Sequence, residues 1–123
     1  MYSVTVRDHI MIAHSLPNPF FGPAQGLHGA TYVIDVTFFS ETLTEENVVI
    51  DIGFAHKALK DVVEMLNYQN LDKLPEFENV LSTTEYVAKF IHEKVKKGVA
   101  EVFEGRIKVQ LGESHVAWAS YEN

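Results

Sequence analysis

Two histidines stand where the chain could bind a metal ion. His14 ends an apolar segment and His28 opens the next one, with a loop rich in glycine and proline between them. If the two segments are strands whose ends meet across this loop, both imidazoles come together. A catalytic zinc ion normally takes three protein ligands and leaves one position for water or substrate. Two histidines alone are therefore a weak signal for a metal site.

Further side chains could move a proton or complete such a site. The chain contains six histidines and no cysteine, which excludes thiolate ligands and a cysteine nucleophile. His115 follows Glu113 by two positions, so both side chains point to one side if the strand there is regular. We rank His115 first as a substitute ligand or proton-transfer group. His9 ranks second, because its spacing from His14 places it on the opposite strand face unless a bulge intervenes.

The composition is that of a packed, acidic domain. The chain has 123 residues, of which 46% are hydrophobic and 22% charged, and its formal net charge is −7. We expect a single domain over residues 1–123. The negative charge argues against a nucleic-acid partner, because phosphate binding needs clustered Lys and Arg. No apolar run approaches the ~18 residues of a membrane helix, and no signal peptide is visible, so we expect a cytoplasmic protein with no membrane partner.

Strand patterns lie at both ends of the chain and helical patterns between them. Alternating apolar and polar residues predict strands over residues 2–14, 29–39 and 106–121, with a bulge or bend at Gly112. Apolar residues recur at helical spacing from Phe54 to Leu66 and again after Ser82. Ser82 and Glu85 have the spacing of a capping box, which predicts that the second helix begins at Ser82.

The order strand, strand, helix, helix, strand, strand predicts an α+β fold. We expect a four-stranded antiparallel sheet with both helices packed on one face. Such a sheet leaves two edges and one face to cover, so we also expect a homo-oligomer.

Six short segments, in this order along nearly the whole chain, resemble the 6-pyruvoyltetrahydropterin synthase and 6-carboxytetrahydropterin synthase family. They are Ile12-Ala13-His14, Leu27-His28-Gly29-Ala30-Thr31-Tyr32, Val49-Ile50-Asp51-Ile52, Leu66-Asn67-Tyr68-Gln69-Asn70-Leu71-Asp72, Ser82-Thr83-Thr84-Glu85 and Gly112-Glu113-Ser114. The resemblance implies the tunnelling fold (T-fold), a homohexamer with pockets at subunit contacts, and a zinc-dependent reaction on a pterin.

The resemblance also assigns zinc ligands, and one of them is missing. His14 matches the family's first zinc histidine, and His28 matches the first histidine of its His-Gly-His motif. Residues two apart on a strand point to the same face, so both histidines of that motif reach one metal ion. Ala30 stands in the second of these positions, and its methyl group cannot ligate. The implied zinc site is therefore incomplete at Ala30.

The family's catalytic residues are replaced as well. Its catalytic cysteine matches a place near Ala24, and its Asp-His pair matches Asn67 and Tyr68. An asparagine takes up no proton at neutral pH, and an unperturbed tyrosine has a pKa of ~10. The cysteine-centred relay is thus absent, and Tyr68 and His115 remain as candidate proton-transfer groups.

The pterin-binding part of the family pattern is better preserved. A pterin presents an N–H and an amino group side by side, and a carboxylate can accept both in a bidentate pair. The resemblance implies Glu113 for that role, with Thr83, Thr84 and Glu85 bonding to the same ring. A plain helix cap would explain Glu85 without any ligand, a place in the first turn would explain Thr83, and a charged strand end would explain Glu113.

Three functions follow as hypotheses. The first is an enzyme of lyase or synthase type that acts on the side chain of a dihydropterin with an altered metal and catalytic site. The second is a pterin- or purine-binding module without turnover. The third is a purely structural oligomer.

Overall fold

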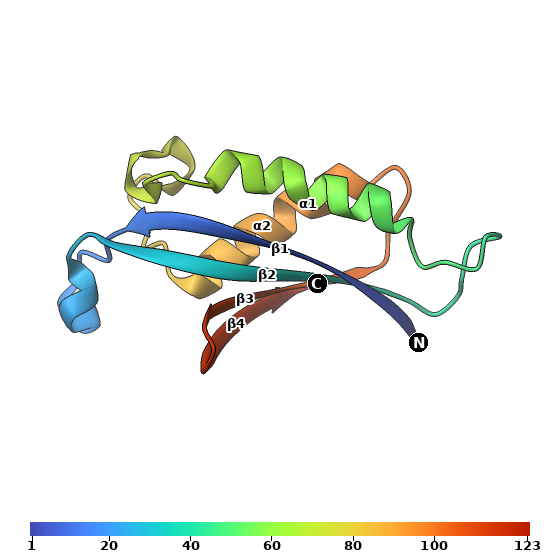
Figure 1. Cartoon of the computed structure of the whole chain (residues 1–123), viewed down its shortest axis with the longest axis horizontal. Coiled ribbons are helices and arrows are strands. Elements are labelled where there is room, and N and C mark those ends of the chain that lie inside the picture. Colours follow the sequence, from blue (N-terminus) through green and yellow to red (C-terminus); the bar gives the residue numbers. More distant parts are fainter.

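The computed structural model describes all residues, 1–123, and contains one sheet and two long helices (Figure 1). The strands are β1 (Tyr2–His14), β2 (His28–Ser40), β3 (Arg106–Ser114) and β4 (Ala117–Glu122), and the long helices are α1 (Ile52–Leu66) and α2 (Thr84–Val99). Three short 3-10 segments complete the chain: η1 (Pro19–Gln25), η2 (Leu71–Lys73) and η3 (Pro75–Phe77). No helix is long and apolar enough to cross a membrane.

The four strands form an antiparallel sheet in the order β1-β2-β3-β4. Both helices lie on one side of it, α1 against β1 and α2 against β3 and β4 (Figure 1). Most even-numbered residues of β1 and β2, such as Ile10 and Tyr32, are buried beneath the helices, whereas most odd-numbered ones are exposed. We call these two sides the inner and outer faces. The predicted fold class is confirmed.

Each long helix begins at a capping side chain. Asp51 Oδ2 accepts a hydrogen bond from the Phe54 N–H at 2.8 Å, and Thr83 Oγ1 accepts one from the Tyr86 N–H at 3.2 Å. These bonds satisfy backbone donors that have no partner within the helix. The predicted start at Ser82 is wrong by one residue, because the Thr83 hydroxyl caps α2. The Ser82 hydroxyl is left for another partner.

The segment after α1 covers the open edge of β1. The Asn67 Oδ1 accepts from the Met11 N–H at 2.9 Å, and the Tyr68 N–H donates to the Met11 carbonyl at 2.7 Å. Further along, the Ala13 N–H donates to the Gln69 carbonyl at 3.0 Å. These bonds pair edge groups that would otherwise invite another strand. Asn67 therefore has a structural role at this edge.

The hairpin of β3 and β4 is irregular near its tip. The pairing register shifts between Gly112 and Ser114, which confirms the irregularity predicted at Gly112. A bulge of this kind re-aims the side chains that follow it.

His92 on α2 is a buried histidine away from the paired strand ends. Its Nε2–H donates to the Ile107 carbonyl at 3.1 Å, and its Nδ1 is buried with no hydrogen-bond partner. Burial is the main cause that lowers the pKa of His92 below its ordinary value of 6.5, with Lys96 acting in the same direction. The bond to Ile107 and the charge of Glu93 oppose the shift.

We expect His92 to make folding sensitive to mild acid. Just below pH 6.5 the unfolded chain binds this proton and the folded chain does not, so the free energy of unfolding falls as the pH falls. One titrating group changes the free energy of unfolding by at most about 1.4 kcal/mol per pH unit. Urea unfolding between about pH 5 and 7.5 measures the slope. His92→Gln should flatten it and the exposed His9→Gln should not; equal slopes in all three proteins would contradict the prediction.

Candidate functional site

The two predicted metal histidines lie side by side at one end of the sheet. His14 and His28 are directly paired in the β1–β2 register, and both are even-numbered residues of the inner face. Their ring centroids are 4.6 Å apart and the ring planes are inclined by 63°. His14 is buried, with 4% of its surface exposed, while His28 is half-buried. The loop that includes η1 thus brings the two imidazoles together, as the sequence predicts.

Each imidazole is held through its Nδ1 atom. His14 Nδ1 lies 3.0 Å from the Ser82 Oγ, and His28 Nδ1 donates to the Gly26 carbonyl at 2.8 Å. Because a carbonyl only accepts, His28 carries its proton on Nδ1 when neutral and keeps the Nε2 lone pair free. Outer hydrogen bonds of this kind orient histidines that ligate metals.

His14 is kept in its neutral form. Burial is the largest cause that lowers its pKa below 6.5, and the charge of His28 lowers it further. The bond with Ser82 and the carboxylates of Asp72 and Glu113 raise it by less. A neutral imidazole can accept a proton or donate a lone pair at neutral pH.

The donor set around this pair does not complete a catalytic zinc site. Ala30 lies on the inner face two residues after His28 and pairs with Ile12, next to His14. No group of three His, Asp or Glu side chains in the chain could hold a metal ion. Three protein ligands are the rule for catalytic zinc, so this chain alone supplies two.

A polar cluster continues from the histidine pair toward α2. The Thr84 Oγ1 donates to the Glu113 Oε2 at 3.3 Å and joins the first turn of α2 to the end of β3. Tyr32 is fully buried, and its ring centroid lies 6.5 Å from that of His14. Burial raises the pKa of Tyr32, the Thr84 hydroxyl opposes this shift, and the charges of Glu113 and Glu85 add to it. Tyr32 therefore stays a neutral phenol between the histidines and the carboxylate.

Thr83 and Glu85 flank Thr84 at the start of α2. The Thr83 hydroxyl is used as the helix cap. Glu85 is an exposed residue of the first turn, where a negative charge suits the positive end of the helix dipole. The structural interpretation explains both residues, and Thr84 is the one of the three that is buried and bonded to Glu113.

The predicted proton-transfer residues lie away from His14 and His28 in the single chain. Tyr68 has a left-handed backbone (φ 63°), and its side chain is 78% exposed. His115 lies in the turn between β3 and β4 and lines an outer-face hollow with Trp118. The predicted placement of His115 beside Glu113 is wrong, because the bulge at Gly112 and the turn break the strand alternation. His9 is exposed on the outer face, opposite to His14, as expected.

Sequence reasoning missed three members of the cluster. The sequence assigns Ser82 to the helix cap and gives Tyr32 no role beyond the family-like segment that contains it. Asp72 accepts from the backbone N–H of Ser15 at 3.2 Å and from its hydroxyl at 2.6 Å, which fixes the chain just after His14. The signal for Tyr32 was its even spacing from His28. Asp72 and Ser82 are brought to His14 by loops, whose paths have no periodicity.

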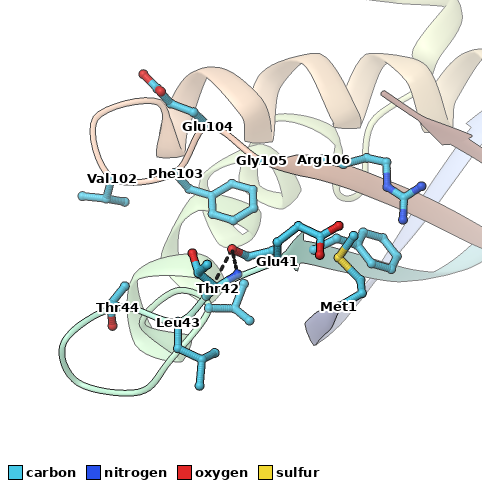
Figure 2. Close-up of a pocket in the computed structure, with 13 residues that line it drawn as sticks. Met1, Glu41, Thr42, Leu43, Thr44, Val102, Phe103, Glu104, Gly105 and Arg106 are labelled. Carbon is cyan, nitrogen blue, oxygen red and sulfur yellow. Dashed lines mark hydrogen bonds between the residues drawn. The ribbon is translucent and has the colours of Figure 1, made fainter.

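A hollow of about 390 Å³ opens next to this cluster. It is lined by residues shortly after His14, by residues directly before Ser82, and by one residue each of η2 and η3: Ser15, Pro17, Asp72, Phe77, Asn79, Val80 and Leu81. Another hollow, of about 420 Å³, lies near the start of β1 and the end of β2, which is the opposite end of the sheet (Figure 2).

Comparisons with known proteins point to one family. The family model described as 6-pyruvoyl tetrahydropterin synthase matches residues 3–123. A 6-carboxy-5,6,7,8-tetrahydropterin synthase of Aquifex aeolicus is 31% identical over an alignment 103 residues long; the match covers 68% of this chain and 64% of that relative's length. The solved 6-pyruvoyl tetrahydropterin synthase of Caenorhabditis elegans superposes with a TM-score of 0.87 at 25% identity, covering 99% of this chain and 95% of that one. The Plasmodium vivax structure of the same name shares the fold, with a TM-score of 0.83 at 14% identity and coverage of 99% and 97%.

Proposed function

The chain belongs to the 6-pyruvoyl tetrahydropterin synthase family, and from this premise we propose that it is a pterin synthase-like protein that binds a dihydropterin at the inner-face cluster. The observation that carries the proposal is the hydrogen bond from Thr84 to Glu113. It holds a carboxylate at the end of the sheet where the two imidazoles lie, and Glu113 is close enough to act on the pKa of His14.

Glu113 has the chemistry that a pterin ring requires. A carboxylate with one oxygen bonded to Thr84 keeps lone pairs free on both oxygens. These can accept the ring N–H and the neighbouring amino group in a bidentate pair. The ring would then extend toward the imidazoles, with its side chain next to His14 and His28.

We assign no chemical step to zinc. His14 and His28 would be the two protein ligands of a metal ion, and the third position of the family pattern is Ala30. A resident zinc ion would act as a Lewis acid on the oxygens of the pterin side chain. Two imidazoles do not fit that role without a further donor.

We also propose that the chain forms a homo-oligomer, as the family resemblance implies. The exposed side chains of Tyr68 and His115 support this proposal, because they lie outside the cluster within one chain. In an oligomer they would face a neighbouring subunit, where proton transfer to a bound pterin would still be open to them.

A second candidate function is pterin binding without turnover. The methyl group of Ala30, at the position of the third metal ligand, favours it. Incubation with dihydroneopterin triphosphate separates the two candidates: a changed pterin side chain supports the synthase-like activity, and binding with an unchanged ligand supports the module.

Pterin recognition is tested by comparing two ligands. Dihydropterin should bind at least about tenfold more tightly than dihydrolumazine, in which an oxygen replaces the amino group, because one charge-assisted hydrogen bond is worth about 1.5–3 kcal/mol. In the lumazine complex a ligand oxygen would also face the Glu113 carboxylate. Isothermal titration measures both affinities. Equal binding of the two ligands, or binding of neither, would contradict the proposal.

A further inference from the structure

A second apolar surface lies at the end of the sheet remote from the histidine pair. It surrounds the segment Val48–Ile50, which connects β2 to α1. Three hollows of about 420, 270 and 280 Å³ adjoin here, and Val49 lines all three. We call this region the Val49 surface.

Large apolar side chains around these hollows are exposed to solvent. The exposed fractions are 60% for Ile52, 58% for Val102 and 41% for Phe54. Single exposed apolar residues are ordinary. These three line hollows that adjoin at Val49, and contiguous exposed apolar patches mark interaction sites on protein surfaces.

The largest of the three hollows lies between two loops, as Figure 2 shows. The loop after β2 contributes Glu41 and Leu43, and the loop before β3 contributes Phe103 and Glu104. Leu43 and Phe103 form an apolar floor, since both are at least partly buried, while the two glutamates are exposed at the rim.

The charges around the Val49 surface are mostly negative. Four carboxylate residues line the hollows: Glu41, Glu46, Asp51 and Glu104. The only lysine or arginine among the lining residues is Arg106. Its guanidinium lies 3.3 Å from the Glu122 carboxylate and stacks over the Phe39 ring at 4.2 Å. None of the four carboxylates forms an ion pair with a basic group of the chain.

We propose that the Val49 surface docks a basic, apolar segment of a partner protein. Its large apolar side chains would enter the hollows, and its lysines or arginines would meet the carboxylates at the rim. Electrostatic complementarity of this kind favours encounter and selects the partner. A second copy that docked through the same surface is disfavoured, because the carboxylates of the two Val49 surfaces would then face one another.

The probe for this proposal is a short synthetic peptide of alternating leucine and lysine, added to the full chain and followed by amide NMR shifts. The expected shifts gather at residues 41–54 and 102–106. Peptides with glutamate in place of lysine, or serine in place of leucine, should bind at least about tenfold more weakly. The first loses the attraction to the carboxylates, and the second loses the apolar contacts in the hollows. Shifts spread over all acidic surfaces, or equal binding of the three peptides, would overturn the proposal.

Variants separate the Val49 surface from general attraction between charges. The double variant Val48→Ser with Val102→Ser should bind the leucine-lysine peptide about tenfold more weakly than wild type. Val116→Ser, an exposed valine in the β3–β4 turn, is the matched control and should change nothing. The proposal fails if both proteins bind alike. It also fails if Val48→Ser with Val102→Ser lowers the oligomeric state measured by sedimentation while Val116→Ser does not, since the occupant would then be a second chain.

Discussion

Replacing Ala30 by histidine is expected to raise zinc affinity by about 100-fold or more, since even residues that only support a metal ligand change affinity 10–100-fold. The backbone already places position 30 for this role. It lies on the inner face two residues after His28, and its partner across β1 is Ile12, two residues before His14. A third imidazole there would complete the three-ligand set that catalytic zinc requires.

The supporting bonds of the pair make the effect of this substitution large. His14 and His28 are each bonded through Nδ1, to Ser82 and to the Gly26 carbonyl, so little ordering is left for the metal to impose. Burial also lowers the pKa of His14 and keeps a lone pair available at neutral pH. Zinc binding should therefore release few protons from the imidazoles, and little conformational entropy should be lost.

Zinc titration and thermal unfolding measure the change. Zinc at 100 times its dissociation constant adds about 2.7 kcal/mol of stability, which corresponds to roughly 10 °C for a domain of this size. Thr31→His is the matched control, because Thr31 is exposed on the outer face next to Ala30. The pairing of His14 and His28 as metal ligands is wrong if Ala30→His binds zinc no better than wild type. The gain should also disappear when His14→Ala is added.

Periodicity in the sequence was enough to predict the sheet and the helices. Alternation predicts the two strands whose ends meet at His14 and His28, and the register of β1 and β2 pairs these two residues directly. The error at His115 has a local cause. The same rule was extended across Gly112, where the bulge shifts the register and the strand then ends in a turn.

The candidate site was less predictable than the fold because hydrogen-bond partners depend on loops. Ser82 and Thr83 are adjacent hydroxyl residues, and the capping-box spacing to Glu85 favours Ser82 as the helix cap. The packing of the loop decides, since Ser82 is buried against His14 and Thr83 faces the helix N-terminus. Asp72 lies 58 positions after His14, and its effect on the pKa of that histidine comes from tertiary contact alone.

Replacing Glu113 by glutamine is expected to weaken dihydropterin binding by about 10- to 150-fold, because hydrogen bonds to charged groups contribute about 1.5–3 kcal/mol. The side chain keeps its size, and an amide oxygen can still accept from Thr84. Its NH2 group, however, would face the donors of the pterin, so one hydrogen bond is lost and two donors meet. Fluorescence or calorimetric titration gives the affinity.

Three comparisons make this measurement specific to the carboxylate. Glu64→Gln changes an exposed glutamate on α1 and should bind dihydropterin as wild type does. Thr84→Val removes the hydroxyl that holds Glu113 and should weaken binding by less than Glu113→Gln, because the carboxylate remains. Dihydrolumazine should lose far less affinity in Glu113→Gln than dihydropterin, since the glutamine NH2 can donate to its oxygen. If Glu113→Gln instead binds dihydropterin as tightly as wild type, Glu113 is a charged strand end and the ligand is held elsewhere.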